Sequence, residues 1–164
     1  SEGKARLQGA NDMDRDIRLS VRVGYIKLDG SSAPEMHRQE LLLAAHSRTY
    51  LCEYELPDAD YARGVFAVLP DDPNIAPAVL RLRDTRELHL PEAQARVLSC
   101  ERSGDGLDVV LTADAFLHAV HVKEAFAMSD NYFDLLPGQV KRVHVAGASD
   151  CPSWHAVRAG STCG

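Results

Sequence analysis

Apolar and polar residues alternate along much of this sequence, most clearly near its start. Between Ile17 and Tyr25 every odd position is apolar, and the even positions carry two arginines, a serine and a glycine. A period of two places the apolar side chains on one face of an extended chain and the polar ones on the other. The pattern predicts a half-buried strand over residues 17–28, with a bulge or strand end where the alternation slips at residues 25–28.

Further short segments have the same strand-like character, and turn signals separate them. They are residues 36–43, 50–56, 65–69, 79–83, 95–102, 107–112, 116–122, 125–128 and 140–145. The strongest turn is Ser103-Gly104-Asp105-Gly106, because glycine adopts positive φ angles without a steric cost. Helical periodicity is nearly absent, and turns recur at intervals of roughly 8–12 residues, which is typical of an antiparallel sandwich. The pattern therefore predicts an all-β fold.

A change of composition divides the chain. Residues 84–91 are charged and contain a proline, and they separate the first group of strands from the second. We expect one domain at residues 1–86 and another at residues 87–148. Residues 149–164 are rich in small and polar side chains and hold the only tryptophan, Trp154. They are expected to form a tail or extension.

Composition and charge narrow the classes of function. Of 164 residues, 45% are hydrophobic and 26% are charged, which excludes disorder, collagen and coiled coil for the whole chain. No apolar run approaches the roughly 20 residues that a membrane span needs. The net charge of -6 repels nucleic acid and anionic lipid, so neither is an expected partner.

The N-terminal sequence does not indicate the cellular compartment of the protein. The chain opens Ser1-Glu2-Gly3-Lys4, without an initiator methionine or an apolar signal segment. We expect either that a leader has been removed or that this is a piece of a longer protein. The localisation stays open between cytoplasmic and secreted or periplasmic.

The four cysteines do not form a metal motif. None is part of a C-x-x-C pair, and no histidine lies at zinc-finger spacing from them. Cys52 and Cys100 lie in alternating segments and are expected as small buried hydrophobes. Cys151 and Cys163 lie in the polar tail and are able to pair, although nothing requires it. The disulfide state is therefore open.

The acidic and histidine clusters also lack the residue spacing of a known metal site. Asp12, Asp14 and Asp16 have the spacing that begins an EF-hand loop, but its glycine and its twelfth-position glutamate are missing. A charged turn is the expected interpretation, with a calcium site of another type as the alternative. His118 and His121 are three apart in a predicted strand and would point to opposite faces.

No catalytic constellation is recognisable from the spacing of residues. No histidine lies beside a serine or cysteine in a nucleophile motif, there is no glycine-rich phosphate loop, and the carboxylates fall in turns and on polar strand faces. We therefore predict no catalytic residue, no metal site and no cofactor in this chain. Most aromatic side chains lie at inward positions of the predicted strands. Tyr61 and Trp154 are the best exposed candidates for stacking on a sugar.

One segment between two predicted strands is expected to stabilise the fold. Phe133 and Leu135 alternate as inward side chains, and Pro137-Gly138 makes a tight turn. Tyr132 is able to hydrogen-bond nearby backbone in the manner of a tyrosine corner. Polar side chains of the segment are able to satisfy loose N–H groups. The residues of this structural motif are Asp130, Asn131, Tyr132, Phe133, Asp134, Leu135, Pro137 and Gly138.

The same segment, residues 129–138, carries a family resemblance. Together with the hairpin at residues 103–112 and the strand at 140–145, it resembles the C-terminal immunoglobulin-like domain of β-mannosidases. These are multidomain enzymes of glycoside hydrolase family 2. The first half of the chain, with Asn11-Asp12 and the Gly30 turn, is similar to the preceding domain of that family. That domain is an immunoglobulin-like sandwich likened to a carbohydrate-binding module.

The resemblance implies two antiparallel immunoglobulin-like β-sandwich domains in tandem. In this family the catalytic glutamates lie in a TIM barrel of about 250 residues or more, which cannot fit in this chain. The chain is then expected to be a non-catalytic accessory region that stabilises the barrel of the same polypeptide. The parent would be a retaining exo-glycosidase that removes terminal β-D-mannose in carbohydrate catabolism.

Two alternatives remain open on the sequence alone. The chain is either an independent immunoglobulin-like module that binds mannose-containing oligosaccharide, or the same region of a related family 2 exo-glycosidase. An exo-β-glucosaminidase and a β-galactosidase-like enzyme are the candidates for the latter. Only the sugar pocket of the barrel separates these enzymes.

Overall fold

The computed structural model describes residues 3–31, 35–72 and 75–157. In these ranges the regular structure consists of antiparallel β-strands and one short 3-10 helix, η1 (Thr85–Glu87). The all-β fold of antiparallel sheets that the alternation predicts is confirmed. The chain divides into two compact units, one of residues 1–27 and 33–83, the other of residues 28–32 and 84–164.

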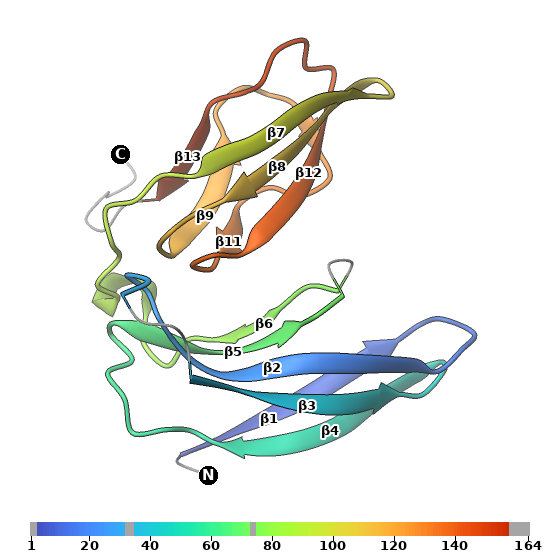
Figure 1. The fold of residues 1–164 in the computed structure, drawn as a ribbon, viewed down its shortest axis with the longest axis vertical. Coiled ribbons are helices and arrows are strands. Elements are labelled where there is room, and N and C mark those ends of the chain that lie inside the picture. Colours follow the sequence, from blue (N-terminus) through green and yellow to red (C-terminus); the bar gives the residue numbers. More distant parts are fainter. Residues whose placement is uncertain (1–2, 32–34, 73–74, 158–164) are drawn as a thin grey trace. The chain divides into compact units, whose positions relative to one another are not determined.

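The first unit contains two antiparallel sheets (Figure 1). A four-stranded sheet has the order β3-β2-β5-β6, and a two-stranded sheet pairs β1 with β4. The strands are β1 (Lys4–Asn11), β2 (Ile17–Lys27), β3 (Glu35–Leu43), β4 (Ser47–Glu55), β5 (Gly64–Pro70) and β6 (Ala78–Leu80).

The core of the first unit follows from the alternation along β2. Leu19, Val21 and Val23 are buried, and they form one cluster with buried residues of β1, β3 and β5. After Val23 the buried positions change to even numbers, with Ile26 buried between Tyr25 and Lys27. The pairing of β2 with β3 and β5 stays regular across this point. The slip in the alternation therefore marks a change of buried face at the end of the strand, since β2 ends at Lys27, and not a bulge.

The second unit is a sandwich of two antiparallel sheets. One sheet has the order β10-β12-β8-β7 and the other β11-β9-β13 (Figure 1). The strands are β7 (Arg96–Ser103), β8 (Gly106–Thr112), β9 (Leu117–Val122), β10 (Ala127–Met128), β11 (Phe133–Leu135), β12 (Val140–Ala146) and β13 (Trp154–Val157). One apolar cluster draws on both sheets, since Val109 and Val143 of the first join Val120 and Leu135 of the second. All four side chains are fully buried.

Two glycines fix turns of the second unit. Gly104 has a φ of 57° and begins the two-residue turn between β7 and β8, as the sequence predicts. Gly30 has a φ of 68°, and a Cβ there would overlap the carbonyl oxygen of Asp114. The turn that follows β2 is held in this unit by a hydrogen bond from the Phe116 N–H to the Leu28 oxygen at 2.7 Å.

The C-terminal residues contribute a strand. Residues 149–164 are expected from the sequence as a tail or extension, and β13 lies in this range. It pairs with β9, with Trp154 opposite Val122 and His155 opposite His121. The third strand of the β11-β9-β13 sheet is thus formed by residues that show little strand pattern in the sequence. Cys163 lies outside the described residues.

We predict that Phe133→Ala lowers the free energy of unfolding of the second unit by about 3–5 kcal/mol, because Phe133 is a core aromatic with 8% of its surface exposed. Denaturant unfolding of the full chain measures the change. The matched control is Val140→Ala on β12, where 58% of the residue is exposed and the loss should be under about 1 kcal/mol. A loss at Phe133 as small as that of the control would contradict its place in the core.

Candidate functional site

The segment at residues 129–138 holds strand β9 through a carboxylate. Asp134 Oδ1 accepts a hydrogen bond from the Ala119 N–H at 3.1 Å and lies 2.8 Å from His118 Nδ1. Ala119 has a φ of 48°, a conformation that non-glycine residues adopt at a steric cost. The hydrogen bond to Asp134 satisfies the N–H of this kinked residue. The carboxylate therefore fixes an irregular point in the middle of β9.

The aromatic ring of Phe133 is enclosed by groups from three other strands. It lies opposite Val120 of β9, and its centroid is 6.1 Å from that of Trp154 on β13. Lys141 Nζ of β12 is 4.8 Å from the ring centroid and 2.6 Å from Asp130 Oδ2. The ion pair holds the ammonium group over the ring, where a cation–π contact is favourable.

Tyr132 is the exposed member of the segment. It has a φ of 57°, and its backbone N–H donates to Asn131 Oδ1 at 3.0 Å. Its ring stacks on His121, with centroids 5.1 Å apart and planes 17° apart, and 64% of the residue is exposed. The ring thus lies against a histidine of β9 at the surface. The tyrosine-corner interpretation predicts instead a hydroxyl turned toward nearby backbone.

The end of the segment closes through hydrogen bonds that two backbone N–H groups donate. The Leu136 N–H donates to Gln139 Oε1 at 3.0 Å, and the Gly138 N–H donates to the Ala113 oxygen at 2.8 Å. Gly138 has a φ of 72°, so Pro137-Gly138 forms the turn that leads into β12. Leu135 and Leu136 are both buried. The structure therefore brings the motif residues together as one connection between β10 and β12.

The two histidines of β9 have separate partners. His118 contacts Asp134, whereas His121 Nδ1 lies 2.9 Å from the Ala119 oxygen and its ring faces Tyr132. Across the described ranges no group of three or more His, Cys, Asp or Glu side chains is arranged to hold a metal ion.

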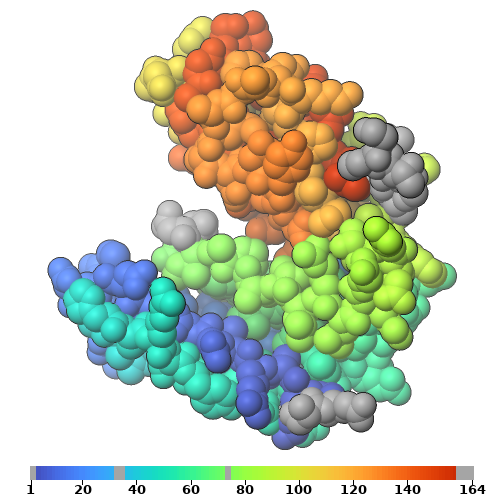
Figure 2. Space-filling view, turned by 180° about the vertical axis from the view of Figure 1, so that it is seen from behind, coloured from blue at the N-terminus to red at the C-terminus, as the bar shows by residue number. Residues whose placement is uncertain are grey.

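The acidic segment at residues 12–16 forms the turn between β1 and β2. Asp16 Oδ1 accepts from the Ala45 N–H at 2.9 Å, and Asp14 Oδ1 lies 2.8 Å from His46 Nε2. Asn11, which is 2% exposed, donates to the oxygens of Leu43 and Ala44 at 3.1 Å. Figure 2 shows this turn and the β3–β4 turn side by side at the surface of the first unit.

The two aromatic residues proposed for sugar contact are partly buried. Tyr61 packs edge-on against Tyr25, with centroids 5.4 Å apart, and its hydroxyl donates to the Pro57 oxygen at 3.1 Å. Burial raises the pKa of Tyr61. Trp154 packs against Phe133, and its buried Nε1 has no hydrogen-bond partner among the described residues.

Tyr50 is exposed, although the alternation of residues 50–56 places it inward with Cys52 and Tyr54. In the pairing of β1 with β4, Leu7 faces Cys52 but Gln8 faces Tyr50, so Leu51 is an extra residue in a bulge. The bulge reverses the faces of β4, and 55% of Tyr50 is exposed. The alternation of residues 50–56 does not reveal this bulge, so it does not predict the exposure of Tyr50.

The outer face of β1 and β4 combines this tyrosine with polar groups. A shallow depression of ≈ 280 Å³ is lined by Gln8, Gly9, Ala10, Arg48, Thr49 and Tyr50. Such a set offers an aromatic ring and amide, guanidinium and hydroxyl groups for hydrogen bonds. An aromatic face with polar neighbours has the chemical character of a sugar-contacting surface.

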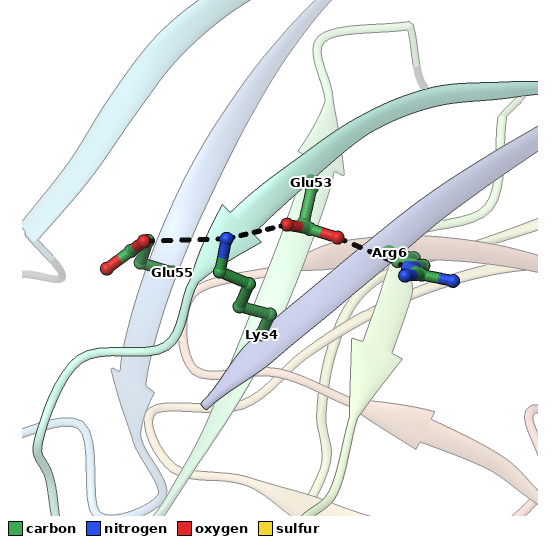
Figure 3. A network of polar contacts seen from close by, with 4 residues as sticks. All are labelled: Lys4, Arg6, Glu53 and Glu55. Atoms are coloured by element: carbon green, nitrogen blue, oxygen red, sulfur yellow. Dashed lines mark hydrogen bonds and ion pairs between the residues drawn. The ribbon is translucent and has the colours of Figure 1, made fainter. Parts of the chain in front are cut away.

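A charged network lies further along the same strands (Figure 3). Lys4 Nζ is 2.8 Å from Glu53 Oε1 and 3.7 Å from Glu55 Oε1, and Arg6 Nε is 3.2 Å from Glu53 Oε2. The hydrogen bond that Lys4 donates to Glu53 raises the pKa of Lys4, and the hydrogen bonds that Glu53 accepts from Lys4 and Arg6 lower the pKa of Glu53. Because these groups are open to solvent, the network contributes little to stability.

A histidine lies between two carboxylates in the second unit. His144 Nδ1 of β12 is 2.8 Å from Asp108 Oδ1 of β8, and its Nε2 is 3.1 Å from Asp105 Oδ1. The hydrogen bonds that the His144 ring donates to Asp108 and Asp105 raise the pKa of His144, and the bond with His144 lowers the pKa of Asp108. Sequence reasoning does not single out this cluster, since His144 is 36 residues from Asp108 and 39 from Asp105 in the chain. The arrangement links the β7–β8 turn to β12.

Comparison with known proteins found a matching domain family and a similar solved structure. Residues 88–156 match the family model Ig_mannosidase, described as an Ig-fold domain. A solved structure of a β-D-mannosidase from Dictyoglomus thermophilum has a similar fold, with a TM-score of 0.76 and 18% sequence identity. The match covers 89% of this chain and 18% of that one. No curated protein matches this chain.

These matches confirm the resemblance to the C-terminal immunoglobulin-like domains of β-mannosidases. The family match lies in the second half of the chain, where the segment at residues 129–138 carries the resemblance. It also includes most of β13. The present chain spans about a fifth of the length of the similar solved chain.

We predict that His144 titrates above the ordinary histidine pKa of about 6.5. Its contribution to stability is present below that pH and is lost as the pH rises through its raised value in the folded state. The contribution of Asp108 is present above about pH 3.9 and is lost as the pH falls through its lowered value. The cluster should therefore stabilise the fold most between about pH 4 and 6.5.

An NMR titration of the His144 ring measures the pKa directly, with Asp108→Asn as the matched variant that should lower it. The difference in free energy of unfolding between the wild type and His144→Gln should be larger at about pH 5.5 than at about pH 8.5. A His144 pKa at or below about 6.5 would contradict the arrangement.

Proposed function

We propose that this chain is the non-catalytic C-terminal accessory region of a β-mannosidase of glycoside hydrolase family 2. The observation that carries the proposal is that two independent comparisons point to the same kind of protein. The family model covers residues 88–156, and the fold match covers 89% of the chain. A sequence pattern and a backbone arrangement are different properties, so their agreement supports this assignment over another sandwich protein.

The roles of the carboxylates support an accessory function. Hydrolysis with retention requires two carboxyl groups about 5–5.5 Å apart that face a sugar. Here Asp134 holds a kinked residue of β9, Asp130 pairs with Lys141, and Asp108 pairs with His144. Each of these groups is engaged in holding strands together.

The domain organisation that we propose is two immunoglobulin-like sandwiches with a boundary near residue 86. Both units contain two antiparallel sheets, and the division into compact units between residues 83 and 84 supports a boundary in this stretch. The capping box of η1, in which Asp84 Oδ1 accepts from the Arg86 N–H, gives the connection a defined structure.

The partner that we propose is a TIM-barrel catalytic domain of the same polypeptide. The barrel would cleave terminal β-D-mannose, and the sandwiches would stabilise it. The 18% share of the similar solved chain supports this, since the larger part of that chain lies outside the match. The related exo-β-glucosaminidase and β-galactosidase-like enzymes are the alternatives for the parent activity.

The depression beside Tyr50 favours one second candidate, an immunoglobulin-like module that binds mannose-containing oligosaccharide. Tyr50 presents more than half of its surface to solvent, with Gln8 and Arg48 beside it. Tyr61 and Trp154, the two residues proposed from the sequence, are the other candidates for sugar contact.

Expression of the complete reading frame that encodes this chain tests the main proposal. We predict that kcat/KM for an aryl β-D-mannoside exceeds that for the corresponding β-glucosaminide and β-galactoside by at least about tenfold. The purified chain of 164 residues serves as the control and should release no aryl group from any of the three. A preference for another sugar would replace the β-mannosidase assignment with that of the related enzyme.

A titration of the purified chain with mannooligosaccharides tests the second candidate. If the chain is a binding module, amide NMR signals of Gln8, Arg48 and Tyr50 shift with sugar concentration, and Tyr50→Ala abolishes the shifts. Tyr61→Ala is the matched control, because that ring packs against Tyr25. The absence of any shift at millimolar sugar would remove the binding-module candidate.

A further inference from the structure

The segment between β12 and β13 runs antiparallel to β7. The Gly147 N–H donates to the Asp105 oxygen at 2.9 Å, and Arg102 Nη2 donates to the Ser149 oxygen at 3.5 Å. From the first contact to the second, the residue numbers increase along the β12–β13 segment and decrease toward β7, which is the antiparallel direction. Cys151 lies two residues after Ser149, and Cys100 of β7 lies two residues before Arg102, so the Arg102–Ser149 contact, continued in the antiparallel direction, brings Cys151 beside Cys100.

The two thiols are neighbours in the structure. Burial, together with the hydrogen bond between the Cys151 and Cys100 thiols, raises the pKa of Cys151 to about 11. Cys100 is partly buried against the core cluster of the second unit, whereas Cys151 is exposed. One sulfur is therefore held in place by packing, and the other is open to a reagent in solution.

The ends of the segment that carries Cys151 are fixed. On one side Ala148 is 2% exposed and belongs to the core cluster. On the other side Trp154 pairs with Val122 in the second sheet. Because only a few residues separate these anchors, Cys151 cannot move far from β7.

We propose that Cys100 and Cys151 are a disulfide-forming pair that joins the β12–β13 connection to β7. The oxidant is a low-molecular-weight disulfide such as oxidised glutathione. One cysteine thiolate attacks a sulfur of that disulfide and releases one glutathione thiolate. The second cysteine then attacks the mixed disulfide and releases the other. Two cysteine thiols are oxidised, one glutathione disulfide is reduced to two thiols, and two protons pass from the cysteines to the products.

The bond would close a loop of about 50 residues that contains most strands of the sandwich. Cross-linking a loop of this length restricts the unfolded chain strongly, so the oxidised form should melt at a higher temperature. The pairing also differs from the Cys151–Cys163 pair that the sequence leaves open.

Tryptic mapping of the full chain identifies the pairing. Trypsin cleaves after lysine and arginine, which places the four cysteines in four different peptides. Cys100 falls in residues 97–102, Cys151 in 143–158, Cys163 in 159–164 and Cys52 in 49–63. The folded chain is incubated with oxidised glutathione at about pH 8.5, where more of the thiols are ionised, then alkylated, digested and analysed by mass spectrometry.

The expected result is a cross-link between peptides 97–102 and 143–158 as the major product. Cys151→Ser should abolish it, and the matched variant Cys52→Ser should leave it unchanged. Oxidation in guanidinium is the second control. There the shorter loop favours the link between Cys151 and Cys163, because the entropic cost of closure grows with loop length.

The melting temperature provides an independent readout. Oxidation should raise it by at least about 5 °C in the wild type and in Cys52→Ser, but not in Cys151→Ser. The proposal is overturned if the folded chain links Cys151 mainly to Cys163. It is equally overturned if Cys100 and Cys151 are both recovered as alkylated thiols.

Discussion

Burial of one apolar face from each of two sheets is the constraint on which the second unit depends. Val109 and Val143 of one sheet meet Val120 and Leu135 of the other, and each is removed from solvent. Each such side chain contributes about 1.5–3 kcal/mol. Strand β9 meets this constraint only with a kink at Ala119, and the Asp134 carboxylate accepts the N–H that the kink leaves without a strand partner.

Much of the fold is predictable from the sequence, because the alternation of apolar and polar residues along a strand shows which face is buried. Leu19, Val21 and Val23 are buried as their period of two requires. Where prediction fails, the cause is an interaction distant in sequence. The bulge at Leu51 turns Tyr50 outward, and β13 forms by pairing with β9 even though its own residues show little pattern.

The candidate sites divide in the same way. The segment at residues 129–138 is recognisable because its polar and apolar residues are contiguous, and it coincides with the region that matches the Ig-fold domain of mannosidases. The pair of Cys100 with Cys151 and the cluster of His144 with Asp105 and Asp108 join residues from segments that are distant in the sequence. No local sequence pattern reveals them, since the folding of the chain brings their side chains together.

The central claim is that this chain is an accessory part of a glycosidase, and the reading frame upstream of Ser1 tests it most directly. We expect a segment of about 250 residues or more with the strand and helix alternation of a TIM barrel. Two glutamates at the carboxyl ends of its strands would supply the acid/base and the nucleophile. A start codon or a signal peptide immediately before Ser1 would contradict the account, and the chain would then be a free-standing module.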